Sequence, residues 1–223
     1  MARVCVFDVN ETLLDLGSLD PLFERAFGDA AVRRSWFQQV LQSAFTATIT
    51  GAYSDFGTVG AAALEMTAER EGVRLSDEDK KGILGGMREL PPHPEVPAAL
   101  DLLRDAGLRL AALTNNAAEV AEAQLENAGL SDRFEKILSA DAVRRLKPAP
   151  EPYHAAAVTM GVEISGVRLV AAHSWDVAGA MRAGCAAAFV ARPGMVLDPL
   201  AEPPDVVGAD LSEVAASIIA AET

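Results

Sequence analysis

The sequence contains little cysteine: Cys5 and Cys185 are the only two among 223 residues. Two thiols cannot build the disulfide framework of a small secreted protein, and so few cysteines are typical of a reducing compartment. Stability must therefore come from a hydrophobic core. Half of the residues are apolar, which is enough at this length for one domain, or for one domain with an insertion.

Positive charge is also scarce, because 19 Lys and Arg stand against 32 Asp and Glu, for a formal net charge of −13. Nucleic acids and anionic membrane surfaces attract clustered basic side chains, so the balance argues against both partners. No apolar run approaches the length of a membrane span, and Val4 to Phe7 is too short for the apolar part of a signal peptide. We expect a cytoplasmic protein.

Five short apolar runs have the length and the flanks of buried parallel strands. In chain order they are Val4 to Phe7, Leu108 to Leu113, Phe134 to Leu138, Val167 to Ala171 and Ala187 to Val190. Stretches with helical spacing separate the later runs, and a glycine closes each of these stretches. They are Val96 to Asp105, Ala118 to Ala128, Glu151 to Met160 and Val177 to Ala183, and Leu211 to Ala221 reads as a final helix. This alternation predicts an α/β fold with a doubly wound, Rossmann-like parallel sheet.

Residues 16–92 interrupt the alternation, because they show helical periodicity without a credible strand. The expected helices are Pro21 to Phe27, Ala30 to Ile49, Phe56 to Glu71 and Ser76 to Leu90. We therefore predict a core of residues 1–15 and 93–223 and an inserted helical cap of residues 16–92.

Polar residues follow the predicted strands at the points where the strands end. Asp8 follows the first strand, Thr114 and Asn115 follow the second, and Asp176 comes shortly after the fourth. Ligands of open α/β sheets bind outside the carboxyl ends of the strands. We expect these residues to converge on one edge of the sheet.

The segments around these residues resemble the four motifs of the haloacid dehalogenase superfamily, in the superfamily's order and over the whole chain. The first is Val4 to Thr12, VCVFDVNET, in which the resemblance makes Asp8 a nucleophile supported by Thr12. The second contains Thr114 and Asn115, which would bind the anionic group of the substrate. Lys147 matches the third, as the cation that neutralises the nucleophile.

Tyr153 follows Lys147 at the spacing of the type II 2-haloacid dehalogenases, and Val170 to Asp176 matches the fourth motif. Two departures from the phosphatase branches bear on the reaction. Asn10 stands where phosphatases have an aspartate that acts as general acid and base, and an amide carries no such proton. Ala172 stands where they have a carboxylate for magnesium, a metal that needs hard oxygen ligands.

Displacement of halide by a carboxylate needs neither a metal nor a proton on the leaving group. The resemblance therefore implies hydrolysis of a small 2-haloacid to the 2-hydroxy acid, without metal or cofactor, through an ester on Asp8. In that reading Lys147 keeps Asp8 ionised, and Asp176 holds Lys147 or helps to activate water. Thr12 and Ser174 are expected hydrogen-bond partners in the site.

Phe37 replaces the arginine that type II enzymes usually carry after the tryptophan of the second cap helix. Arg33 or Arg34, one turn away, could substitute for it in part. Ala171 and His173 stand where the best-known members have serine and asparagine. We expect a substrate pocket built from Asn115, Trp175 and Phe37, with His173 donating hydrogen bonds.

Each of these residues also has an ordinary structural interpretation. Asp8 could end a strand, Lys147 could lie in a surface loop and Asp176 could cap a helix. Trp175, Tyr153 and the pair Trp36 and Phe37 could be packing aromatics. Further residues are expected to be structural or exposed, namely His93, His154 and Glu11, whereas His173 is equally compatible with the core and with the site.

Two other functions stay open on the sequence alone. One is a phosphatase or phosphonatase-like hydrolase with a rearranged acid, which magnesium dependence would reveal. The other is a catalytically silent protein that binds a small anion or a partner through its cap. The halogen, the acid, the stereochemical preference and the oligomeric state, including a homodimer, are left open.

Overall fold

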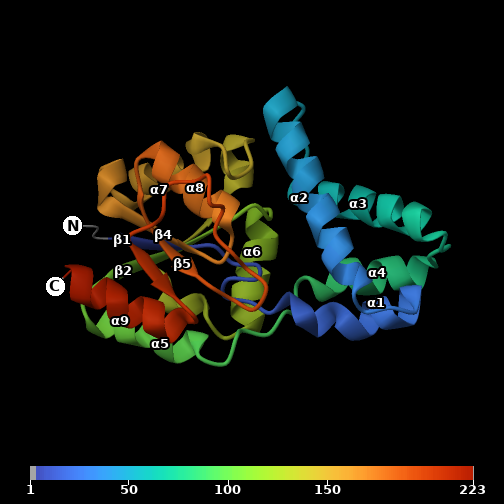
Figure 1. Cartoon of the computed structure of the whole chain (residues 1–223), viewed down its shortest axis with the longest axis horizontal. Helices are drawn as coiled ribbons and strands as arrows, with labels where there is room; N and C mark the ends of the chain where they lie inside the picture. Colours follow the sequence, from blue (N-terminus) through green and yellow to red (C-terminus); the bar gives the residue numbers. More distant parts are fainter. Residues whose placement is uncertain (1–3, 223) are drawn as a thin grey trace.

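A parallel six-stranded sheet forms the centre of one half of the molecule in the computed structural model, which describes residues 4–222 (Figure 1). The strands lie in the order β3-β2-β1-β4-β5-β6. Their bounds are β1 (Val4–Phe7), β2 (Arg109–Thr114), β3 (Lys136–Ser139), β4 (Val167–Ala171), β5 (Ala186–Val190) and β6 (Val206–Gly208). The predicted doubly wound α/β fold is confirmed. The sequence did not predict β6, because three residues carry too little periodicity to be recognised.

Helices cover both faces of this sheet (Figure 1). One face carries α5 (Val96–Asp105), α6 (Ala118–Asn127) and α9 (Leu211–Glu222), and the other carries α7 (Pro150–Met160) and α8 (Ser174–Ala183). The alternation of side chains along a strand explains this division. In β1, Cys5 and Phe7 pack in the cluster of α5 and α9, whereas Val4 and Val6 pack in the cluster of α7 and α8.

The second half of the molecule consists of helices that come between β1 and β2 in the chain (Figure 1). They are α1 (Asp20–Phe27), α2 (Val32–Thr50), α3 (Phe56–Glu71) and α4 (Asp77–Gly86), preceded by a 3-10 turn at Leu16–Leu19. The last predicted helix is shorter than expected, since it ends at Gly86 and not at Leu90. Two consecutive glycines, Gly85 and Gly86, disfavour continuation because glycine loses much backbone entropy in a helix.

The chain enters and leaves the helical half through two paired segments. The backbone N–H of Asp15 donates to Pro91 at 2.8 Å, and that of His93 donates to Leu13 at 2.9 Å. This pairing supports the predicted boundaries at 15/16 and 92/93, which stay a prediction. Residues 1–3 and 223 of the predicted core lie outside the described residues.

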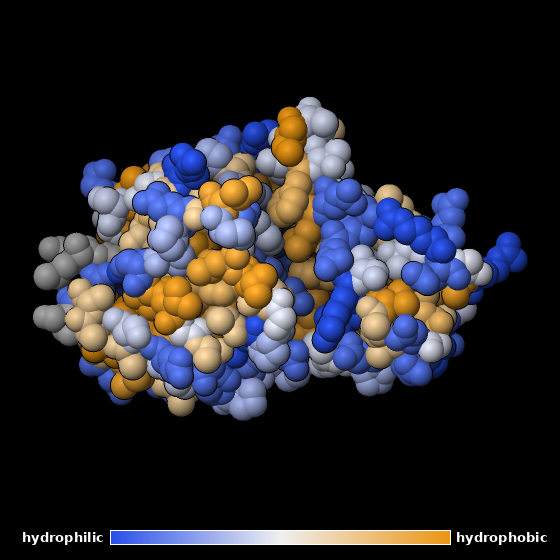
Figure 2. Space-filling view, viewed as in Figure 1, coloured by the Kyte–Doolittle hydropathy of each residue, from blue (hydrophilic) through white to orange (hydrophobic). Residues whose placement is uncertain are grey.

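The strand order reverses between β1 and β4, which lie side by side in the sheet. Such a switch point opens a crevice at the carboxyl ends of the strands. The segments that follow β1 and β4 meet there, opposite the helical half. Figure 2 shows apolar side chains along the junction of the two halves. Within residues 4–222, no helix is both long enough and apolar enough to cross a membrane.

Candidate active site

Asp8 lies at the carboxyl end of β1 and is buried. Its Oδ1 accepts a hydrogen bond from Lys147 Nζ at 2.8 Å, and its Oδ2 accepts one from Thr12 Oγ1 at 2.6 Å. His173 Nδ1 lies 3.2 Å from the same Oδ2. Burial opposes ionisation of Asp8, but Lys147 and His173 outweigh it and hold the pKa of this carboxyl well below its usual range. The result is a buried carboxylate, ionised at neutral pH.

Lys147 connects Asp8 to a second carboxylate. Its Nζ donates to Asp8, to Leu113 O at 3.0 Å and to Asp176 Oδ2 at 2.6 Å, so all three of its protons are used. Burial lowers the pKa of Lys147, but Asp176 and Asp8 outweigh it and leave that pKa raised. The Tyr153 hydroxyl donates to Asp176 Oδ1 at 2.5 Å and fixes the carboxylate from the other side. In its resting state the site therefore holds a protonated ammonium in a fixed position between the two carboxylates.

Asp176 lies in the first turn of α8, which begins at Ser174 and takes His173 as its N-cap. The structural alternative in which Asp176 itself caps a helix is wrong, because its carboxylate bonds Lys147 and Tyr153 instead. Burial and the nearby charge of Asp8 raise the pKa of Asp176, against the effect of Lys147. The surface-loop interpretation of Lys147 is wrong as well, since its side chain is 1% exposed.

Thr12 joins the segments that follow β1 and β4. Its Oγ1 accepts from the backbone N–H of Ala172 at 2.9 Å while it donates to Asp8. Its carbonyl accepts from Arg192 Nη2 at 2.8 Å, and Arg192 also pairs with Glu95 at 2.5 Å. Because Thr12 Oγ1 already accepts from Ala172, the hydroxyl directs its own proton toward Asp8.

His173 bridges two carboxylates. Its Nδ1 faces Asp8 Oδ2, and its Nε2 lies 2.9 Å from Glu11 Oε2. Burial lowers the pKa of His173, but its hydrogen bonds to Asp8 and Glu11 outweigh it and raise that pKa to about 9. The imidazole is therefore protonated at neutral pH, and both of its N–H groups donate.

Glu11 was expected to be exposed, and that expectation is wrong. Its side chain is 18% exposed and contacts His173 and Arg33, whose Nη1 lies 3.8 Å from Glu11 Oε1. The φ of Glu11 is 62°, in the left-handed region that few residues other than glycine adopt. Arg33 is buried on α2, where its Nε donates to Asp20 Oδ1 at 2.5 Å. The positive charge of Arg33, on the cap, therefore contacts the site through Glu11.

Several predicted site residues are hydrogen-bonded to other parts of the protein, most of them to the backbone. The Asn115 amide bonds the main chain of Lys147 in both directions, at 2.7 and 3.3 Å. Asn10 Oδ1 accepts from Gln124 at 3.1 Å, and Ser174 Oγ accepts from the N–H of Asp198 at 2.8 Å. Thr114 Oγ1 accepts from the N–H of Asn116 at 3.2 Å, which leaves its own proton free to donate.

Two aromatic side chains cover His173. The Trp175 ring stacks on the imidazole with 5.2 Å between centroids, and the Phe37 ring lies 6.3 Å away. Trp175 Nε1 is buried without a hydrogen-bond partner among the described residues, and Lys147 Nζ lies 6.0 Å from the Trp175 ring centroid. An unpaired, buried indole N–H is suited to an anion, since an orphaned buried donor is costly.

A cavity of about 180 Å³ lies between the helical half and the start of α6. Phe37 and Asn116 are among its walls, together with apolar side chains of α2 and α3 such as Val40 and Phe56. Phe37 therefore separates His173 from this cavity.

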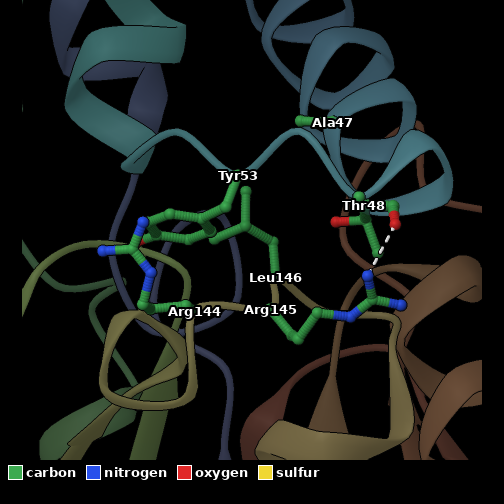
Figure 3. Close-up of a pocket in the computed structure, with 7 residues that line it drawn as sticks. Ala47, Thr48, Tyr53, Arg144, Arg145 and Leu146 are labelled. Atoms are coloured by element: carbon green, nitrogen blue, oxygen red, sulfur yellow. Dashed lines mark hydrogen bonds between the residues drawn. The ribbon is translucent and has the colours of Figure 1, made fainter.

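A second, much smaller hollow of about 30 Å³ lies at a contact between the two halves of the molecule (Figure 3). Arg145 Nη1 donates to Thr48 O at 3.0 Å, and the Arg144 guanidinium lies 4.7 Å from the centroid of the Tyr53 ring. The Tyr53 hydroxyl bonds Asp141. This hollow has room for about one water molecule, so it is a junction and not a substrate pocket.

Sequence reasoning missed the residues that orient the site from a distance. Gln124, Arg192 and Glu95 come from separate helices and loops, and no short motif contains them. Arg34 is exposed and takes no part in these contacts. Among residues 4–222, no three His, Cys, Asp or Glu side chains are grouped so that they could hold a metal ion.

Comparisons with known proteins agree with this geometry. The haloacid dehalogenase-like hydrolase family matches residues 2–184. "Haloacetate dehalogenase H-2" of Moraxella sp. (strain B) is 30% identical over 89% of this chain and 90% of its own, and "(S)-2-haloacid dehalogenase" of Xanthobacter autotrophicus is 32% identical over 86% and 76%. The structure of L-2-haloacid dehalogenase from Xanthobacter autotrophicus with chloropropionic acid covalently bound superposes with a TM-score of 0.91, at 28% identity over 98% of each chain. Because the family model matches residues 2–184, the chain belongs to the haloacid dehalogenase-like hydrolase family.

Proposed function

We propose that this protein hydrolyses the carbon–halogen bond of a small 2-haloacid to give the 2-hydroxy acid and a halide ion, without a metal. The observation that carries the proposal is the buried Asp8 carboxylate, kept ionised by Lys147 and His173. An ionised carboxylate is the form that attacks carbon. The dehalogenases to which the chain is similar act on haloacetate and (S)-2-haloacids.

The roles follow from the contacts. Asp8 attacks the carbon that bears the halogen and forms an ester, as the covalently bound chloropropionic acid suggests for the Xanthobacter enzyme. Lys147 holds the ionised carboxylate, and Asp176 with Tyr153 holds Lys147. Water then hydrolyses the ester. The free proton of Thr114 is suited to the substrate carboxylate.

Trp175 is the best candidate for the leaving halide. The Asn115 amide bonds Lys147, and both ring nitrogens of His173 face carboxylates. The Trp175 N–H has no partner among the described residues, and the ring that carries it has its centroid 6.0 Å from Lys147 Nζ. Phe37 adds an apolar wall without a charge.

A phosphatase is less well supported. Asn10 cannot act as a general acid because an amide has no acidic proton at neutral pH, and its amide oxygen accepts from Gln124. Ala172 is buried and supplies no ligand where phosphatases have a carboxylate for magnesium. A dianionic phosphate ester would also meet the charges of Asp8 and Asp176 with only Lys147 and His173 to offset them.

Halide release tests the proposal directly. Chloro-, bromo- and fluoroacetate and both enantiomers of 2-chloropropionate are incubated with the protein in excess EDTA, beside a generic phosphate monoester. We expect halide from at least one acid, no effect of EDTA and negligible phosphate. Asp8→Asn should release no halide. Phosphate release that magnesium stimulates well above the halide rate would reverse the order of the two functions.

Isotope labelling distinguishes the ester route from direct attack by water with Asp8 as the base. In a single turnover in oxygen-18 water, the ester route places the label in the Asp8 carboxylate, and the product receives an oxygen that Asp8 already held. Direct attack labels the product at once and leaves Asp8 unlabelled. A cytoplasmic location is part of the proposal.

A further inference from the structure

The most unusual feature of the site is an imidazole placed between the nucleophile and a second carboxylate. His173 Nδ1 lies 3.2 Å from Asp8 Oδ2, and Nε2 lies 2.9 Å from Glu11 Oε2. We propose that the His173 imidazolium is a catalytic residue of ester hydrolysis, where it stabilises the negative charge that develops on Asp8 Oδ2. This inference rests on the proposed function, because it assigns the second half of that reaction.

The hydrogen bonds to Asp8 indicate which oxygen attacks. Oδ2 accepts from Thr12 and faces His173, whereas within residues 4–222 Oδ1 accepts from Lys147 alone. The less encumbered Oδ1 forms the bond to carbon, and the halide leaves with the electron pair of the broken carbon–halogen bond. Oδ2 then becomes the carbonyl oxygen of the ester, still opposite two donors.

Ester hydrolysis returns charge to Oδ2. Water adds to Cγ of Asp8, the π electrons move to Oδ2, and one water proton passes to Asp176. The tetrahedral intermediate collapses with cleavage of the bond between Cγ and Oδ1, and the departing alkoxide takes a proton from Lys147. Lys147 recovers that proton from Asp176, 2.6 Å away. The second water proton passes to bulk solvent as Asp8 ionises again.

The two half-reactions respond to the imidazolium in opposite ways. The first removes the negative charge of Asp8, so a cation beside Oδ2 makes the carboxylate a weaker nucleophile and slows ester formation. The second creates an oxyanion on the same atom, so the cation accelerates it, as donors aimed at developing charge do. Removing one such donor typically lowers the rate about 100-fold or more.

Neighbouring residues keep His173 protonated and hold its ring in a fixed orientation toward Asp8. Glu11 holds Nε2 from a left-handed backbone conformation, which is a strained position that must be supported from elsewhere. The charged groups around the imidazole are Asp8 and Glu11 in contact, Arg33 behind Glu11, and Lys147 behind Asp8. Two further carboxylates complete the network, Asp20 on Arg33 and Asp176 on Lys147.

Charge alternates along this chain of contacts, from the cap arginine to Asp176. Asp8 and Glu11, the two carboxylates next to His173, each lie near a second cation, Lys147 and Arg33 respectively. Both carboxylates therefore stay ionised, and the proton stays on the imidazole. Trp175 and Phe37 cover the ring and exclude water from it. The raised pKa of His173, about 9, agrees with this arrangement.

The test separates the two half-reactions. His173→Phe keeps a ring between Trp175 and Phe37 but removes both N–H groups. Wild type and variant are mixed in excess over bromoacetate, halide release reports ester formation, and intact mass of the protein reports loss of the ester. We expect ester hydrolysis to fall roughly 100-fold, while ester formation does not fall. The ester should then accumulate on Asp8.

Two further variants supply matched comparisons. His173→Asn restores a neutral donor and should recover part of the hydrolysis rate, without the decline that we expect of wild type as the pH rises through about 9. Glu11→Gln should keep the donor but move that decline to lower pH, because it removes one anion from His173. Glu122→Gln, an exposed glutamate on α6, should change neither rate.

The outcomes are decisive. Equal loss of both rates in His173→Phe would show that the imidazole only supports the structure and would overturn the inference. Unchanged ester hydrolysis would overturn it as well. Both results leave the proposed function intact, since wild type still releases halide. No halide from wild type with any haloacid would overturn the proposed function and this inference together.

Discussion

Replacing Phe37 by Arg puts a third cation into a site that already has two. The Phe37 ring lies 6.3 Å from the His173 ring and is buried. A guanidinium at this point would face a protonated imidazole, and its charge could also reach the carboxylate of a bound haloacid. We therefore expect two separate effects of Phe37→Arg, a lower pKa of His173 and a lower KM.

The size of the first effect follows from the distance. Two unit charges 6.3 Å apart, at an effective dielectric constant of about 20, repel by about 2.6 kcal/mol. That energy corresponds to about two pKa units. The pKa of His173, raised to about 9 in wild type, should therefore fall to about 7. A charged hydrogen bond of about 1.5 to 3 kcal/mol would lower KM by about 10- to 150-fold.

Labelled histidine makes the first effect directly measurable, because the chain has three histidines. The resonance that disappears in His173→Phe identifies His173, and its shift is followed with pH in wild type and in Phe37→Arg. Phe37→Met is the matched control, since its side chain is long and flexible but uncharged. Both kinetic constants are measured at pH 6.5 and 8.5.

The two variants must differ for the reasoning to hold. If the His173 pKa in Phe37→Arg equals that in Phe37→Met, the electrostatic argument is wrong. If the pKa falls but KM does not, the arginine is directed away from the substrate, for example into the cavity of about 180 Å³ behind Phe37. In the expected case, KM falls at both pH values and ester hydrolysis slows at pH 8.5.

Three further predictions concern stability and the halide. Because the pKa of His173 is raised from 6.5 to about 9, its contribution to the free energy of unfolding is complete below pH 6.5 and is lost as the pH rises through about 9, by about 3 kcal/mol in total. Urea unfolding of wild type and His173→Phe should show their difference shrinking between pH 6.5 and 8.5, and a constant difference contradicts this. Lys147→Met leaves Asp8 and Asp176 buried without their shared cation and should lower the unfolding free energy by about 3 to 5 kcal/mol, measured in the same way; a loss under 1 kcal/mol would show that the carboxylates are solvated. Trp175→Phe removes one N–H and should weaken inhibition by bromide about fivefold, the value of a neutral hydrogen bond of about 1 kcal/mol; unchanged inhibition would place the halide elsewhere.

The sequence predicted the parts of the site that follow directly from strands. Asp8 comes after β1, and the carboxyl ends of parallel strands share an edge, so its proximity to Asp176 after β4 could be expected. The resemblance placed Lys147 beside them. In the structure, Lys147 Nζ lies 2.8 Å from Asp8 Oδ1 and 2.6 Å from Asp176 Oδ2.

The cap contacts could not be predicted in the same way. Whether Glu11 faces solvent or His173 depends on a left-handed backbone at one residue and on the docking of α2, which brings Arg33 within 3.8 Å. Local periodicity predicts neither the backbone conformation nor the docking, because it indicates only which face of a helix is apolar. Asn10 shows the same limit, because its partner Gln124 lies 114 positions away in the chain.

The two departures from the type II pattern are linked in space. That pattern has an arginine at position 37 and an asparagine at position 173, and here the side chains at these positions, Phe37 and His173, are neighbours. The positive charge that the cap lacks at one position is present on the core at the other. An imidazolium bonded to Asp8 and Glu11 acts on the nucleophile itself, whereas an arginine on α2 would act on the substrate. We infer that the exchange moves electrostatic stabilisation from the binding of the haloacid to the hydrolysis of its ester, and we therefore expect weak affinity and fast ester hydrolysis together in this protein.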